Sequence, residues 1–112
     1  MIRTINFALV VLLVVVGPGA QAAPDLKAAA ALAGVTAGMA AGCGLDSKPV
    51  LFEFRSLLDR NSVSSLERER LNQIVIDSSA LGLKMQKEPS SMPCSEVRSR
   101  MRSTIETLRS AR

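Results

Sequence analysis

The chain has 112 residues, a formal net charge of +4 and a hydrophobic content of 47%, and it contains no histidine, tryptophan or tyrosine. The absence of histidine removes the commonest general base and metal ligand, so catalytic sites of the Ser-His-Asp and Cys-His types are excluded. With only two cysteines and no glycine-rich phosphate loop, the sequence predicts no enzyme activity, no cofactor and no metal site.

The N-terminal segment has the three parts of a secretory signal peptide. Arg3 supplies a positive start, residues 5–16 form an almost unbroken apolar run, and residues 20–22 read Ala-Gln-Ala, a small-x-small cleavage site. The run is shorter than the roughly 20 residues that a transmembrane helix needs, and helix-breaking residues follow it. We therefore expect cleavage of residues 1–22. The mature chain, residues 23–112, is expected to be a single periplasmic or secreted domain without a transmembrane span.

The mature chain keeps both cysteines of the protein, Cys43 and Cys94. In an oxidising compartment they allow one intramolecular disulfide, with free thiols or a bond between chains as the alternatives. A domain of about 90 residues has a marginal core, so such a bond would matter. Closing the loop between them should contribute roughly 3–4 kcal/mol in the chain-entropy model.

The first helix of the mature chain is expected over residues 25–43. Its glycines, Gly34, Gly38 and Gly42, recur every fourth residue. A glycine inside a helix costs about 1 kcal/mol relative to alanine, so three of them need a structural reason. The spacing is typical of closely packed membrane helices, and Ala-Ala-Gly before Cys43 resembles a lipid-attachment site, but the segment is poor in large apolar residues. We expect these glycines to pack against a second helix of a soluble bundle.

Three further helices are expected over residues 49–60, 64–82 and 93–110, because apolar residues recur there at spacings of three and four. Ser64 and Glu67 form a capping-box pattern at the start of the third helix. The residues expected to form the apolar face of that helix are Leu71, Ile74, Val75 and Leu81. No stretch alternates with a period of two. The sequence therefore predicts an all-α fold, a small bundle of about four helices stapled by one disulfide.

The last expected helix carries candidate binding residues. Arg98, Arg100, Arg102 and Arg109 lie largely off its apolar stripe. The planar guanidinium suits phosphates and carboxylates, so anionic lipid, lipopolysaccharide or an acidic protein face are the candidate partners. The alternative is a solvated helix surface on which Arg102 pairs with Glu106. Nucleic acid is not expected as a partner, because the chain carries an export signal and only 3% aromatic residues.

The predicted architecture resembles that of the periplasmic acid-stress chaperones. The shared features are the signal peptide, the small size, the helical pattern and the 51-residue separation of Cys43 and Cys94. The chain departs from that family in having no tryptophan before the first cysteine and in its alanine- and glycine-rich first helix. The resemblance implies loosening in acid that exposes apolar faces to unfolding clients. Protonation of all carboxylates would leave the mature chain with a net charge of about +13, and self-repulsion would then favour expansion.

These features predict a non-catalytic exported protein that acts by binding another macromolecule, a protein partner or unfolding clients, in a stress-related or chaperone-like role. One alternative is an envelope-associated structural protein that contacts anionic membrane or lipopolysaccharide through the arginine-rich helix. Another is a secreted inhibitor or effector of one specific partner. The sequence leaves open whether the domain associates with itself.

Overall fold

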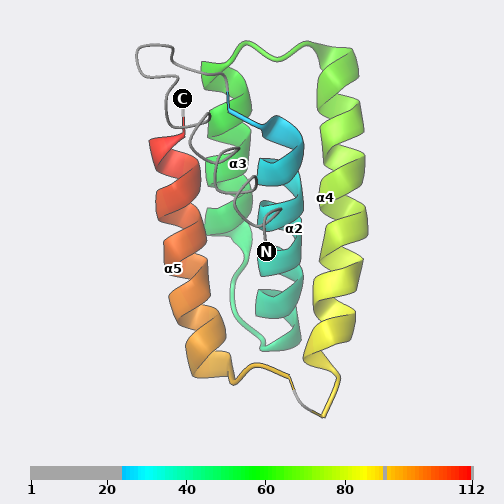
Figure 1. Ribbon diagram of the computed structural model, residues 1–112, viewed down its shortest axis with the longest axis vertical. Coiled ribbons are helices and arrows are strands. Elements are labelled where there is room, and N and C mark those ends of the chain that lie inside the picture. Colours follow the sequence, from blue (N-terminus) through cyan, green and yellow to red (C-terminus); the bar gives the residue numbers. More distant parts are fainter. Residues whose placement is uncertain (1–23, 90, 112) are drawn as a thin grey trace, which may run out of the picture.

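The computed structural model describes residues 24–89 and 91–111 (Figure 1). The described helices are α2 (Leu26–Gly42), α3 (Lys48–Arg60), α4 (Ser65–Gln86) and α5 (Cys94–Ser110). Since no strand occurs in these ranges, the predicted all-α fold with four helices is confirmed. The expected signal peptide, residues 1–22, lies outside the described residues and stays a prediction. None of the described helices is long and apolar enough to cross a membrane.

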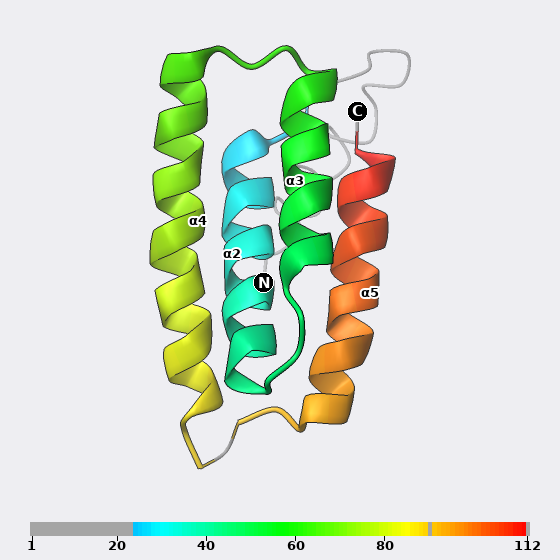
Figure 2. The same cartoon turned by 180° about the vertical axis from the view of Figure 1, so that it is seen from behind.

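The helices alternate in direction, so that α2 runs parallel to α4, and α3 and α5 run the opposite way (Figures 1 and 2). Helix α2 is the central element: α3 and α5 pack on one side of it, and α4 packs along the other. The main apolar core lies where α2, α3, α5 and the first half of α4 meet. Its fully buried members are Ala30, Ala33, Val50, Phe54, Leu57, Leu58, Leu71 and Leu108.

The helix ends are explained by local hydrogen bonds. Asp25 caps α2 by accepting a hydrogen bond from the Ala28 amide at 3.1 Å, and Ser64 caps α4 by accepting one from the Glu67 amide at 3.2 Å. Gly44, with φ of +71°, ends α2 in the left-handed conformation that glycine adopts easily. These signals are local, so the sequence placed those ends to within one residue.

The predicted end of the third helix at residue 82 is wrong, because α4 continues to Gln86. Gly82 is buried inside the helix, where it faces the backbone of Val35 on α2. Glycine can end a helix or allow two helices to approach closely, and only the three-dimensional neighbour separates these roles.

The predicted disulfide between Cys43 and Cys94 is confirmed. The two Sγ atoms lie 2.12 Å apart and the two Cα atoms 5.7 Å apart. Cys43 directly follows the last residue of α2, and Cys94 is the first residue of α5. The bond therefore joins the end of the central helix to the start of the last one.

One buried hydrogen bond between side chains connects α2 to α5 inside the bundle. The hydroxyl groups of Thr36 and Thr104 lie 3.0 Å apart and hydrogen-bond to each other, and both residues are almost fully buried. Because a buried hydroxyl without a partner carries its full desolvation cost, each threonine depends on the other.

Replacing Thr36 with valine should therefore lower the free energy of unfolding by about 1–3 kcal/mol, because the Thr104 hydroxyl loses its partner. The double variant Thr36→Val/Thr104→Val should recover most of that loss, since it removes both polar groups and keeps the side-chain shape. Urea denaturation of the two single variants and the double variant measures the coupling. Additive losses in the double variant would show that the pair is not coupled.

Candidate binding surface

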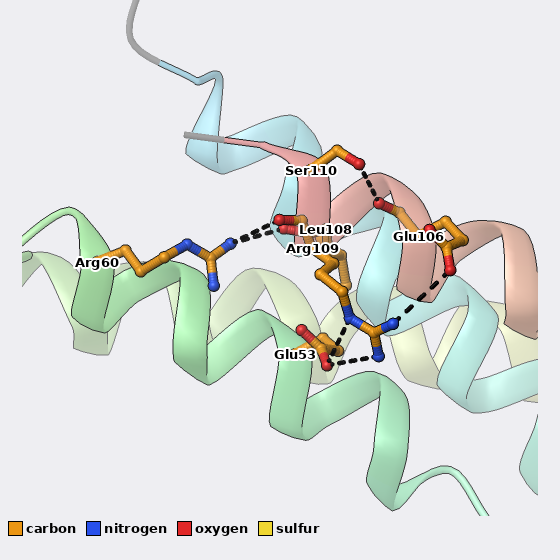
Figure 3. A network of polar contacts seen from close by, with 6 residues as sticks. All are labelled: Glu53, Arg60, Glu106, Leu108, Arg109 and Ser110. Atoms are coloured by element: carbon orange, nitrogen blue, oxygen red, sulfur yellow. Dashed lines mark hydrogen bonds and ion pairs between the residues drawn. The ribbon is translucent and has the colours of Figure 1, made fainter.

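One of the four candidate arginines belongs to a polar network between α3 and α5 (Figure 3). The Nη2 atom of Arg109 lies 3.0 Å from a carboxylate oxygen of Glu53 on α3, and its Nη1 atom lies 3.7 Å from Glu106. Beside this pair, Arg60 of α3 donates to the carbonyl oxygens of Leu108, at 2.9 Å, and Ala111, at 3.2 Å. Arg60 thus satisfies carbonyl groups that the end of α5 leaves without helical partners. The network holds α3 to α5, so Arg109 is already engaged within the fold.

The hydrogen bond from Arg109 to Glu53 raises the pKa of the guanidinium, and the charge of the same carboxylate adds to this effect. For a cation, a raised pKa favours the folded state at every pH below its ordinary value and loses that effect only as the group deprotonates. Arginine deprotonates only in strongly alkaline solution. The shift at Arg109 therefore gives the protein no pH sensitivity in the physiological range.

The other three arginines do not form one patch. Arg98 and Arg102 are four residues apart on one face of α5, whereas Arg100 points to another side and lines a crevice with Leu32 of α2. None of these three forms an ion pair within residues 24–89 and 91–111. The expected pairing of Arg102 with Glu106 is wrong, because Glu106 lies beside Arg109 instead. Only Arg98 and Arg102 remain as adjacent exposed cations on α5.

The glycines of α2 face α4. A Cβ atom at Gly34 would lie 2.5 Å from the carbonyl oxygen of Val75, and one at Gly38 would collide with the carbonyl oxygen of Ser79. Gly42 is exposed, yet a Cβ atom there would lie 2.8 Å from the Cβ atom of Gln86. The closest contacts at Gly34 and Gly38 are thus with backbone atoms of α4, and those at Gly42 are with the side chain of Gln86.

Helix α4 also contributes a glycine to this interface. Gly82 lies against the carbonyl oxygen of Val35, so each helix places a peptide group where the other has no side chain. The two helices therefore interlock along the C-terminal half of α4, from Val75 to Gln86.

Because α4 contacts α2 mainly through glycines and backbone atoms, few of its large side chains enter the core. Only Leu71 and Gly82 are fully buried on α4. Leu81, which was expected on the apolar face, is 52% exposed, so that assignment is wrong. Five of the six exposed large apolar side chains among the described residues belong to this helix. They are Leu66, Ile76, Leu81, Leu83 and Met85.

Two grooves run beside α4, one on each side. The groove toward α3 has a volume of about 410 Å³ and an apolar lining that includes Phe54 and Ile76. The groove near the start of α5 has a volume of about 500 Å³ and is lined by Met39, Met85 and Met92, with carboxylates nearby. Methionine is flexible and polarisable, which suits surfaces that bind varied apolar groups. Of the exposed apolar residues of α4, Ile76 lines the first recess and Met85 lines the second.

Comparisons with protein-family models, with curated proteins and with solved structures found no match to this chain.

The exposed face of α4 is the candidate site that interpretation of the sequence missed. The signal was present, because Leu81 and Leu83 are two residues apart and cannot face the same side of a helix. Apolar residues all around a helix indicate burial on several sides or an apolar surface left open. Which of these applies depends on how many helices surround α4.

Proposed function

We propose that the protein is an exported, non-catalytic binding protein that holds apolar segments of other proteins on the surface around α4, in a chaperone-like role. The observation that supports this proposal is the concentration of exposed large apolar side chains on one helix beside two grooves. Contiguous exposed apolar surface on a small domain is typical of interaction sites. The disulfide fits an extracytoplasmic location, in agreement with the expected signal peptide.

Acid would strengthen this activity by loosening the fold. The 14 basic residues of the chain outnumber its 10 acidic ones, and its net positive charge would rise in acid. Repulsion would then favour expansion and expose more of the apolar surface that α2 and α4 share.

The test measures light scattering of a heat-labile client enzyme in the presence of the oxidised protein, at neutral and at acidic pH. We expect near-stoichiometric protein to suppress client aggregation, and the double variant Ile76→Ser/Leu81→Ser to lose most of this effect. Both side chains are exposed, at 59% and 52%, so the variant should keep its fold. The matched control, Arg98→Glu/Arg102→Glu, changes the exposed cations of α5 and should suppress aggregation as the parent protein does.

An envelope role is the second candidate, and the exposed pair Arg98 and Arg102 is the observation that favours it. If the protein suppresses aggregation neither at neutral nor at acidic pH, the chaperone-like proposal is overturned. Salt-sensitive sedimentation with anionic vesicles, lost in Arg98→Glu/Arg102→Glu, would then support the envelope role. Recovery of one stoichiometric protein partner would instead support a secreted inhibitor or effector.

A further inference from the structure

The groove between α3 and α4 is a recess of about 410 Å³ whose lining residues all come from these two helices. Helix α3 packs against α2 and α5, whereas α4 packs chiefly along α2. The apolar side chains that line this groove are Leu51, Phe54, Leu58, Val75 and Ile76. Leu83 continues the exposed side of α4 one heptad after Ile76.

The two charged residues that line this groove are arginines, one of which is already paired with a carboxylate outside the lining. Arg55 and Arg68 line it, and no carboxylate is among its lining residues. Arg68 donates to Asp59 at 2.8 Å and to the carbonyl oxygen of Val63 at 3.0 Å, which fixes its direction. Arg55 is exposed and forms no ion pair within the described residues. The groove beside α5 is different, because Glu88 and Glu96 line it.

We propose that the α3–α4 groove binds an amphipathic α-helix of a partner protein whose apolar stripe is flanked by carboxylates. This inference rests on the proposed function and names the partner chemistry of one of its two grooves. The apolar stripe would cover Ile76 and Leu83, and a flanking carboxylate would face Arg55, the lining arginine without an ion pair among the described residues. A partner helix of about 15 residues would span the distance from Arg68 to Leu83, because a helix rises about 1.5 Å per residue.

The test uses the full mature protein with its disulfide and a fluorescent 15-residue amphipathic peptide that carries leucines on one face and glutamates beside them. A second peptide replaces every glutamate with lysine. Fluorescence anisotropy should show binding of the acidic peptide and at least tenfold weaker binding of the basic one. Ile76→Ser should weaken binding of the acidic peptide about tenfold, and Arg55→Glu should reverse the preference between the peptides.

Two matched controls separate the groove from the rest of the surface. Phe52→Ser removes a similarly exposed apolar side chain, at 61%, that lines neither groove, and Arg100→Glu reverses a charge on α5. Both should bind the acidic peptide as the parent protein does. Circular dichroism of every variant should show an unchanged helical content.

Equal binding of the two peptides would overturn the charge argument. Weakening by Met85→Ser but not by Ile76→Ser would place the partner in the other groove, and the proposed function would stand. A concentration-dependent dimer in sedimentation velocity that Ile76→Ser dissociates would make a second copy of this chain the occupant and overturn the partner helix. No peptide binding together with intact suppression of aggregation would overturn this inference alone. Absence of both peptide binding and suppression of aggregation would overturn the proposed function.

Discussion

Replacing Gly82 with alanine is expected to lower the free energy of unfolding by about 1–3 kcal/mol, although alanine is the better helix former. A Cβ atom at position 82 would collide with the carbonyl oxygen of Val35 and lie 3.1 Å from the Met39 amide nitrogen. Backbone atoms of a packed helix cannot rotate away as a side chain can, so α2 and α4 would have to separate. Urea denaturation followed by circular dichroism measures the change.

The control for this experiment is the reverse substitution at a nearby exposed position. Ala80 lies two residues before Gly82 on the outer side of α4, and Ala80→Gly should cost about 1 kcal/mol from helix propensity alone. If close packing dominates, both substitutions destabilise the protein, although Gly82→Ala adds a methyl group and Ala80→Gly removes one. If Gly82→Ala stabilises the protein by about 1 kcal/mol, α4 does not approach α2 as closely as described.

Removal of the Cys43–Cys94 bond is expected to lower the free energy of unfolding by roughly 3–4 kcal/mol. The bond closes a loop between residues separated by 51 positions and joins α2 to α5. Proteins of this size are stable by only about 5–15 kcal/mol, so this loss is a large part of the total. The double variant Cys43→Ala/Cys94→Ala and the reduced parent protein should unfold at similar urea concentrations, both well below that of the oxidised protein.

Intact mass with and without reductant and alkylation provides the control for the disulfide experiment. The oxidised protein should be lighter than the reduced one by two hydrogen atoms, and it should accept no alkylating groups until it is reduced. Identical unfolding midpoints for the oxidised and reduced proteins would contradict the stabilising role of the bond.

The parts of the fold that depend on local sequence were predictable. The cap at Ser64, the stop at Gly44 and the apolar stripe through Val97 and Leu108 each depend on residues a few positions apart. The disulfide was also predictable, since two cysteines allow a single internal pairing. These features need no knowledge of which helices are neighbours.

The other features of the fold depend on which helices lie side by side, and the sequence alone does not give that arrangement. Helix α2 buries Ala33 against the core and Gly38 against α4, so it is covered on two sides and has no single apolar stripe that a periodicity could reveal. The burial of Thr104 depends on the position of Thr36, 68 residues away. The exposure of Leu81 depends on α4 lying at the edge of the bundle rather than inside it. The candidate site was missed for the same reason.

The central position of α2 also has a consequence for the order of folding. This helix comes first among the described elements, but most of the surface that covers it comes from α4, later in the chain, and the rest from α3 and α5. An isolated 17-residue helix with glycines in its interior is unstable in water, so α2 gains its structure only when those later helices arrive. A chain emerging N-terminus first would remain unfolded until nearly all of it is available, and truncation before α5 would leave no stable subdomain. Folding of this protein should therefore be a single cooperative event.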